Sequence, residues 1–497
     1  MFNLLQSFSF WKNLVEFLQI PLYDVLWKTS PSFADAFQMD SLPLRQELLS
    51  RVLRSKTRLL NMRNAENFKE DIRMKKFLAM LLALVMVLSL AACGSKPTDD
   101  SGDEKPPVSD ETPDTGSDDA IKIGMICVHD VNSGYDVAHI DGLTAACKAL
   151  GIDVDSQVIF KYNTPEDETC ADAAVDLAEA GCNVIISNSY GHQSFMQDVA
   201  GDYEDIVFIA ATGDTAAPSG LANFKNMFPY TFESRYVSGV VAGMKLKELL
   251  DTGKITDPYV GYVGAYPYAE VVSGYTAFFL GIQSIVPEAH MDVTFTNSWY
   301  DPVKEGEAAN ALMANGCVII GQHADSTGAP TAVQAALENG EIHYSVGYNV
   351  DMLSVAPDAA LTSAQNNWSV LYTQVLQDFL AGNKVAHDYT AGYEADGVMI
   401  SELGKSCAPG TAEKVEEVIK GIKDGTLHVF DTSTFTVGGK AMDSYVFDFS
   451  TMNSDYTAVQ YVGEKIEVIT DGFFHESLYR SAPYFDLRID GITELNN

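Results

Sequence analysis

The sequence is poor in basic residues, and it lacks the short motifs of common catalytic and nucleotide-binding sites. Its 32 lysines and arginines stand against 68 aspartates and glutamates, which gives a formal net charge of −36. A charge of this sign repels nucleic acid and anionic lipid, so neither is expected as a partner. No G-x-x-x-x-G-K-[ST], H-E-x-x-H or G-x-S-x-G occurs, and no glycine-rich turn follows the first apolar strand. These absences favour binding over catalysis.

Cysteines and histidines are too scattered to predict a metal site, a cofactor or a catalytic residue. Apart from one cysteine near the front of the chain, the cysteines are Cys127, Cys147, Cys170, Cys182, Cys317 and Cys407, without a C-x-x-C pair. In apolar strands and helices a free cysteine behaves as a small hydrophobic residue, although a disulfide among the six is left open. The histidines that follow expected strands have no obvious serine or cysteine partner. They are therefore interpreted as hydrogen-bonding groups.

An export signal is predicted at residues 74–93. Lys75 and Lys76 precede an apolar run from Phe77 to Ala92, which is short for a bilayer span. Leu90-Ala91-Ala92-Cys93 resembles the bacterial lipobox, in which the cysteine is acylated and becomes the new N-terminus. We therefore expect a lipid anchor at Cys93. The alternative is a plain secretory signal with an incidental cysteine.

The segments on either side of this signal differ in character. Residues 94–119 contain nine acidic residues, four prolines and almost no apolar side chain, so an extended, self-repelling linker is expected. Residues 1–73 precede a signal that should begin a chain. We interpret them as a misplaced upstream extension, with translation starting at Met74, because Lys69-Glu70-Asp71 can be encoded by a purine-rich ribosome-binding sequence. A helical N-terminal extension is the alternative.

From residue 121 onward, short apolar runs alternate with helical patterns. The expected strands are Ile121–Val128, Val158–Phe160, Asn183–Ile186, Ile206–Ala210, Val260–Val263, Asp292–Phe295, Val318–Gly321 and His343–Val346. The expected helices include Asp141–Leu150, Ala171–Ala180, Ser238–Leu250 and Glu305–Asn315. Apolar strands that alternate with helices indicate parallel sheets covered on both faces. We therefore expect an α/β protein of two doubly wound parallel-sheet lobes over residues 120–497.

Aromatic, carboxylate and amide residues follow nearly every expected strand. They include Tyr135, Asn188, Tyr190, Thr212, Asp214, Tyr266, Trp299, His323, Asp325, Tyr348, Asn349 and Asp351, with Trp368 in a later segment. Ligands of open parallel sheets bind beyond the carboxyl ends of the strands. Aromatic faces stack on flat rings or sugars, while aspartate and asparagine bond their polar edges. The pattern predicts a concave small-molecule pocket. Alternatively, the aromatic residues pack between lobes and the aspartates cap helices.

Six passages in combination carry a family resemblance. They are Gly134-Tyr135 to His139-x-Asp141-Gly142; Gly261-Tyr262-Val263-x-Ala265-Tyr266-Pro267 with Glu270-Val271-Val272; Asn297-Ser298-Trp299-x-Asp301-Pro302; Gln322-His323-x-Asp325-Ser326; Gly347-Tyr348-x-x-Asp351-Met352; and Ala356-Pro357-Asp358 through Leu361-Thr362-Ser363. Over roughly residues 121–380 the chain thus resembles the basic membrane lipoprotein family, a branch of the type I periplasmic binding proteins linked to nucleoside import.

The resemblance implies two lobes joined by crossover strands that close on a purine base or nucleoside. The first lobe would comprise about 120–230 and 360–395, and the second about 231–359 and 396–497. Tyr135 and Tyr190 would stack on the base from the first lobe, and Tyr266 and Trp299 from the second. Asp325 and Asp351 would bond its edge. The site would also be lined by Asn188, His323 and Trp368.

Two departures from the family pattern favour a free base such as adenine. Nucleoside-binding members carry a lysine that contacts ribose three residues after the Thr-Ser serine, where this chain has Asn366. Their Asp-x-Ser-Phe-Asn pattern after the first strand is replaced by Asn132-Ser133-Gly134-Tyr135.

The sequence thus predicts a lipid-anchored, extracytoplasmic receptor without enzymatic activity that delivers a purine to an ABC permease. Three alternatives remain at this point. The first is a signalling receptor of the same fold, and the second is a sugar-binding protein. The third is a nucleoside hydrolase that uses Asp130 and Asp325.

Overall fold

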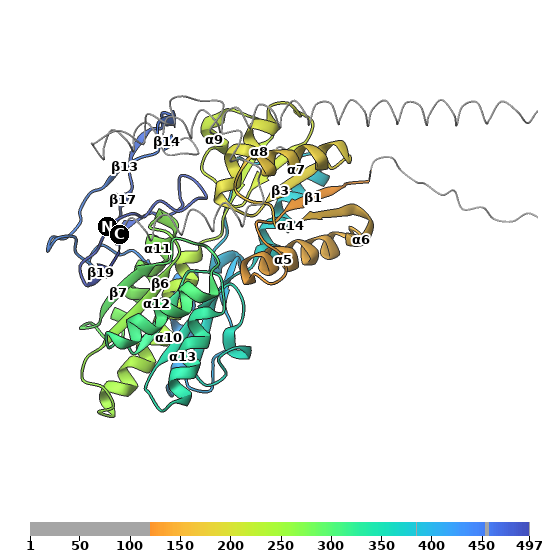
Figure 1. Cartoon of the computed structure of the whole chain (residues 1–497). Coiled ribbons are helices and arrows are strands. Elements are labelled where there is room, and N and C mark those ends of the chain that lie inside the picture. Colours follow the sequence, from red (N-terminus) through yellow and green to blue (C-terminus); the bar gives the residue numbers. More distant parts are fainter. Residues whose placement is uncertain (1–119, 384, 453–456, 497) are drawn as a thin grey trace, which may run out of the picture. The chain divides into compact units, whose positions relative to one another are not determined.

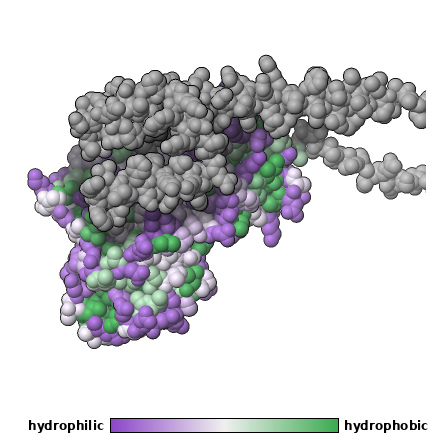
Figure 2. Space-filling model, in the orientation of Figure 1, coloured by the Kyte–Doolittle hydropathy of each residue, from purple (hydrophilic) through white to green (hydrophobic). Residues whose placement is uncertain are grey.

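A computed structural model of the chain describes residues 120–383, 385–452 and 457–496. The predicted upstream extension, export signal, lipid-attachment residue Cys93 and acidic linker lie outside the described residues. The described part contains two α/β lobes, each built around its own sheet (Figure 1). On the face shown in Figure 2, hydrophilic and hydrophobic residues are interspersed over the described surface.

The first lobe has a six-stranded parallel sheet with the order β11-β5-β4-β3-β1-β2. Its strands are β1 Ile123–Ile126, β2 Val158–Lys161, β3 Val184–Ser187, β4 Val207–Ala210, β5 Phe224–Met227 and β11 Asp388–Tyr389. Its helices are α5 Gly134–Leu150, α6 Val154–Gln157, α7 Glu168–Glu179, α8 Gln193–Ala200, α9 Ala216–Ser219 and α14 Trp368–Leu380. Strands such as β1 and β3 are buried along their whole length because helices cover both faces of the sheet.

The second lobe has a seven-stranded sheet with the order β12-β10-β9-β8-β6-β7-β19, in which only β12 is antiparallel. Its strands are β6 Tyr259–Gly264, β7 His290–Phe295, β8 Ile319–Gln322, β9 Tyr344–Tyr348, β10 Ala360–Asn366, β12 Val398–Ile400 and β19 Ile492–Glu494. Its helices are α10 Thr231–Asp251, α11 Ala269–Gln283, α12 Pro302–Ala314, α13 Gly328–Glu338 and α15 Thr411–Lys423. Short 3₁₀ turns lie at η1 Tyr190–His192, η2 Met352–Ser354 and η3 Tyr393–Ala395.

Helices α10 and α11 cross at a distance that only glycine permits. A β-carbon on Gly239 would lie 2.0 Å from the Phe278 carbonyl oxygen, and one on Gly281 would lie 2.1 Å from the Tyr236 carbonyl oxygen. Both distances are far below van der Waals contact, so the two glycines bring the helix backbones together. This pair of helices forms part of the apolar core of the second lobe.

The predicted fold class is confirmed, and all eight predicted strands occur within a few residues of their expected positions. One boundary differs from the expectation. Strand β10, at 360–366, belongs to the sheet of the second lobe, so the second segment of the first lobe begins near residue 368 and not at 360. The helix that follows, α14, packs against α5. The polypeptide therefore passes between lobes at 228–230, near 367 and at 390–397.

Residues 432–496, called here the C-terminal segment, form short strands beside both lobes (Figure 1). These are β13 Val446–Asp448, β14 Thr451–Met452, β15 Val459–Tyr461, β16 Lys465–Glu467, β17 Ile469–Thr470, β18 Phe473–Phe474 and finally β19. The segment is anchored on the second lobe, because β19 pairs in parallel with β7 and the side chains of Phe474, Tyr484 and Phe485 are buried in that lobe's core.

Candidate functional site

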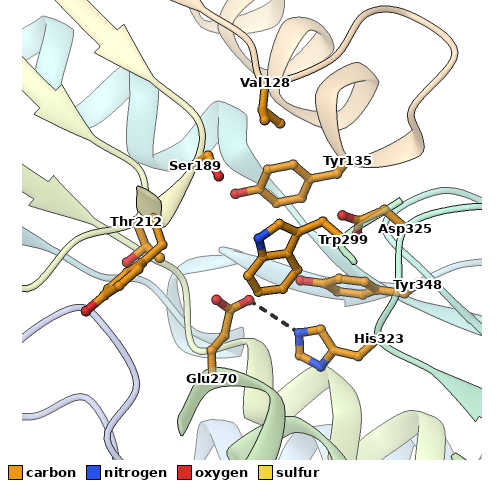
Figure 3. Close-up of a pocket in the computed structure, with 10 residues that line it drawn as sticks. Val128, Tyr135, Ser189, Thr212, Glu270, Trp299, His323, Asp325 and Tyr348 are labelled. Atoms are coloured by element: carbon orange, nitrogen blue, oxygen red, sulfur yellow. Dashed lines mark hydrogen bonds and ion pairs between the residues drawn. The ribbon is translucent and has the colours of Figure 1, made fainter. Parts of the chain in front are cut away.

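A cavity lies where the carboxyl ends of strands from both lobes meet (Figure 3). In the first lobe the lining residues follow strands β1, β3 and β4. In the second lobe they follow strands β7 and β8 or lie at the end of β9 and in the first turn of α11. The lining residues are Val128, Tyr135, Ser189, Tyr190, Thr212, Glu270, Trp299, His323, Asp325 and Tyr348. With the side chains in this arrangement the free space in the cavity is about 20 Å³, which is room for about one water molecule, so a small-molecule ligand requires the walls to move apart.

Aromatic rings from opposite lobes face one another across this cavity. Figure 3 shows Tyr135 from the first lobe opposite Trp299 and Tyr348 from the second. Trp299 is supported from behind by Tyr266, whose ring centroid lies 5.2 Å away in an edge-to-face contact, and Tyr266 in turn stacks on Tyr268 at 5.0 Å. The aromatic walls are thus held by further aromatic packing, which fixes their orientation for a flat ligand.

A buried arginine supports the Tyr348 wall from the protein side. The guanidinium carbon of Arg235 lies 3.6 Å from the centre of the Tyr348 ring, and the side chain is 2% exposed. Its Nη1 donates a hydrogen bond of 2.6 Å to the Gln322 carbonyl oxygen. This cation–π contact is fully desolvated, the setting in which such contacts are strongest.

Two hydroxyl oxygens of the cavity wall have no hydrogen-bond partner within the described residues. They are the Thr212 hydroxyl oxygen and the Tyr348 hydroxyl oxygen, and both are buried. Most buried polar side-chain atoms in proteins are paired, so an unpaired one at a cavity calls for an explanation. A polar ligand group in the cavity would supply the missing partner for each.

Burial shifts the ionisable groups of the cavity wall towards their neutral forms. His323 Nε2 lies 3.3 Å from Glu270 Oε1. Burial, with a smaller contribution from the nearby Arg235 charge, holds the pKa of His323 well below its usual value. Burial also raises the pKa of Glu270 to about 7, although Arg235 opposes the shift. Glu270 is therefore divided between its neutral and charged forms at neutral pH.

Asp325 is the second carboxyl group of the cavity. Burial, assisted by the charges of Glu305, Asp136 and Glu270, raises its pKa well above the usual value. Its Oδ1 accepts a hydrogen bond of 2.7 Å from Asn349 Nδ2. A protonated carboxyl group can both donate and accept a hydrogen bond, as can the Tyr348 hydroxyl. The cavity therefore offers adaptable polar groups between aromatic faces.

Comparison with known proteins identifies the family. A family model described as ABC transporter substrate-binding protein PnrA-like, the Bmp family, matches residues 120–431. The chain belongs to this family. It is accordingly a substrate-binding protein of an ABC transporter, which confirms the resemblance read from the sequence. Members of the Bmp family bind small ligands, work with ABC permeases and are solute-binding receptors, not a class of enzymes.

Individual relatives have different ligands. A purine-binding protein of Brucella abortus is 31% identical over 319 residues, which cover 63% of this chain and 84% of that protein. A putative ABC transporter glucose-binding protein of Haloferax volcanii is 32% identical over 258 residues, which cover 52% of this chain and 61% of that protein. Among solved structures, an ABC transporter solute-binding protein of Aeropyrum pernix matches with a TM-score of 0.52 at 16% identity. That match covers 62% of this chain and 93% of the other, and it concerns the fold alone.

Five of the nine ligand-binding residues predicted from the Bmp resemblance line the cavity. These are Tyr135, Tyr190, Trp299, His323 and Asp325. Asn188 and Tyr266 lie directly behind the wall. Asn188 is buried, and its side chain accepts from the Val128 amide at 3.0 Å and donates to Asp136 at 2.7 Å, so it positions the wall of the first lobe.

The structure places the other two predicted residues away from the cavity. Asp351 is exposed and caps the turn η2, where its carboxylate accepts a hydrogen bond of 2.8 Å from the Leu353 amide. Trp368 is buried in the core of the first lobe, where it stacks on His139 with a centroid distance of 3.8 Å. Asn366, at the lysine position of nucleoside-binding Bmp members, accepts a hydrogen bond from the Thr231 hydroxyl at 2.8 Å.

The cavity also includes residues that the sequence analysis did not predict as ligand-binding: Val128, Ser189, Thr212, Glu270 and Tyr348. Thr212 and Tyr348 are among the residues that follow expected strands, and Glu270 belongs to one of the six passages that carry the Bmp resemblance. The sequence therefore contained an indication that these three residues lie near the site. Arg235 supports the site from α10, where Glu233 and Lys245 are also buried charged residues, so no local pattern distinguishes it.

The described residues contain neither a candidate membrane-spanning helix nor a candidate metal-binding cluster. No helix in 120–383, 385–452 and 457–496 is long and apolar enough to cross a bilayer. Over the same described ranges, no three side chains of histidine, cysteine, aspartate or glutamate are grouped so as to hold a metal ion.

Proposed function

We propose that the protein is a lipid-anchored, extracytoplasmic receptor that binds a purine base or nucleoside between its lobes for an ABC importer. The observation that carries the proposal is the cavity itself. Aromatic rings from both lobes face it, and two buried hydroxyl groups of its wall lack partners. A purine has two flat apolar faces and an edge of hydrogen-bond donors and acceptors, and therefore matches both features.

In the proposed complex each wall has a separate role. Tyr135 contacts one face of the purine, and Trp299 and Tyr348 contact the other from the second lobe. Asp325, Thr212 and the Tyr348 hydroxyl bond its edge, and Glu270 adjusts its protonation to the ligand group that it meets. Because the contacts come from both lobes, ligand binding favours the closed arrangement of the lobes over an open one. The permease then recognises the closed receptor.

Purine is favoured over sugar by the opposed rings. A pyranoside also stacks on aromatic rings and bonds carboxylates, and the Haloferax volcanii relative is described as glucose-binding. However, the match to the Brucella abortus relative covers a larger share of that relative's length, and that protein is described as purine-binding. The cavity also presents aromatic faces on two sides, which suits a planar ring better than a puckered one.

A binding screen tests the ligand. The purified protein is unfolded and refolded to remove carried-over ligand, and its thermal unfolding is followed with adenine, guanine, hypoxanthine, adenosine, guanosine, ribose or glucose. A ligand present at about a hundred times its dissociation constant stabilises the native state by roughly 2.7 kcal/mol. Stabilisation by a purine supports the proposal. Stabilisation by glucose alone, or by none of these ligands, rejects it.

Two further experiments test the anchor and the transport role. Cells that express the protein are grown with labelled fatty acid, and we expect label on the wild-type chain and none on Cys93→Ser. Uptake of labelled purine should fall when the gene is deleted and recover on re-expression. Normal uptake in the deletion strain, with purine binding intact in vitro, would favour a signalling receptor.

A further inference from the structure

A second cavity, of about 150 Å³, adjoins the first. It shares the wall residues Tyr190, Thr212 and Glu270 with the first cavity and is also lined by Asp214, Tyr268, Ala269, Arg480, Ala482 and Pro483. The last three residues belong to the C-terminal segment, and the Bmp family model ends at residue 431. This chain thus adds a wall next to the proposed ligand site that lies outside the family match.

The C-terminal segment contacts the two lobes in chemically different ways. On the second lobe it is held by apolar packing, for example by Phe485 stacked on Phe430 with a centroid distance of 4.2 Å. On the first lobe, polar bonds hold it. Ser481 donates from its amide and its hydroxyl to Asp388 Oδ1 at 2.8 and 2.7 Å. Tyr461 accepts a bond of 2.6 Å from Gln197. The segment therefore spans the two lobes beside the second cavity.

Arg480 is the cationic group of the second cavity, and its position is fixed. Its guanidinium carbon lies between 5.6 and 5.8 Å from the ring centres of Phe447, Phe449 and Tyr484. Nε donates to the Ala482 carbonyl oxygen at 3.3 Å, and Nη1 donates to Asp214 Oδ2 at 3.3 Å. A guanidinium group has five N–H donors, so these two bonds leave donors for a ligand.

Asp214 completes a buried charged pair with Arg480. The Asp214 side chain is 8% exposed and that of Arg480 is 14% exposed. Tyr190 donates to the same Asp214 oxygen at 3.0 Å, and Gln193 donates to the other at 3.1 Å. A buried ion pair contributes little net stability compared with apolar residues of similar size. A role in ligand recognition accounts for its position at the cavity wall better than a role in stability.

We propose that the second cavity is a subsite of the ligand site and that Arg480 and Asp214 bind a hydroxylated substituent of the ligand there. The inference rests on the proposed function, because the purine ring in the first cavity places its substituent in the second. Arg480 supplies donors, while the Tyr190 hydroxyl oxygen, Asp214 and Glu270 supply acceptors. Hydroxyl groups donate and accept at once, so a pentose fits this set. A phosphate does not, since it would face two carboxyl groups.

The subsite makes Arg480 a specificity-determining residue that favours a nucleoside over its free base. The test measures dissociation constants of adenosine and adenine by calorimetry on the full chain, for the wild type, Arg480→Met and Arg488→Met. Arg488 is the matched control, because it is the other arginine of the C-terminal segment and its side chain bonds Asp486 and Glu494 away from both cavities. We expect Arg480→Met to weaken adenosine binding at least tenfold and adenine binding less than twofold, whereas Arg488→Met changes neither.

Other results separate the two proposals. If Arg480→Met weakens adenosine and adenine equally, or weakens neither, the subsite is wrong and the purine receptor stands. If the wild type binds neither ligand nor any other purine, the proposed function fails and the subsite fails with it. Circular dichroism checks that Arg480→Met folds. If it does not fold, Asp214→Asn, which changes only the first-lobe partner of Arg480, is measured in its place. The same loss of adenosine binding relative to adenine binding is then expected.

Discussion

Replacing Glu270 with glutamine should weaken the dependence of stability on pH. Burial raises the pKa of this carboxyl group from 4.5 to about 7, so the folded state holds the proton more tightly than the unfolded state. The resulting stability is fully present below pH 4.5 and is lost as the pH rises through about 7. A difference of this size corresponds to about 3 kcal/mol in total, most of which is lost between pH 5 and pH 8.

The assay is urea unfolding of the ligand-free protein at pH 5 and pH 8. Three other buried glutamates also have raised pKa values, Glu233 and Glu305 at about 7 and Glu476 at about 8. The wild type should therefore lose more stability than Glu270 alone explains, and Glu270→Gln should lose about 2–3 kcal/mol less than the wild type over the same interval. Glu416→Gln, on the exposed side of α15, is the control and should lose as much as the wild type. An equal loss in Glu270→Gln and in the wild type would refute the assignment of a raised pKa to Glu270.

Three further predictions concern the ligand, the core and the thiols. Trp299→Ala should weaken purine binding roughly 5- to 150-fold, because stacking of a base on an aromatic ring is worth about 1–3 kcal/mol; calorimetry checks this, and an unchanged dissociation constant would remove Trp299 from the site. Gly239→Ala should lower the free energy of unfolding in urea by about 1–3 kcal/mol, because its β-carbon would meet the Phe278 carbonyl oxygen. Gly201→Ala is the control and should be tolerated, since the nearest atom to its new β-carbon is 3.8 Å away. Buried cysteines such as Cys170, whose thiol pKa is raised to about 12 by burial, should react with a thiol reagent only after unfolding, and rapid labelling of the native protein would contradict the described packing.

Much of the fold could be predicted because buried parallel strands leave a direct trace in the sequence. Runs such as Val184–Ser187 are apolar at all but the last position and buried throughout, since both faces of the sheet are covered. The carboxyl ends of such strands meet at one edge, so residues after them converge without further information. That rule was sufficient to find Tyr135, Trp299 and Asp325.

The remainder of the site depends on packing that no local pattern records. Tyr266 and Trp299 both follow strands, yet Tyr266 lies behind Trp299 and only the latter reaches the cavity. Trp368 is directed into the core by its stacking on His139. The carboxylate of Asp351 accepts a hydrogen bond from the Leu353 amide and so caps the turn η2. Arg480 reaches the neighbouring cavity from a segment of short strands, in which neither helical nor strand periodicity indicates where a side chain points.

The first lobe closes its sheet with β11 and covers α5 with α14, and both elements follow the strands of the second lobe in the chain. During synthesis, therefore, the first lobe cannot be completed until residue 389 has emerged. A polypeptide that stops at residue 230 would leave the partners of Leu371, Tyr372 and Leu376 facing water. Neither lobe is built from one continuous stretch of the chain, so the two lobes are expected to complete their folding together.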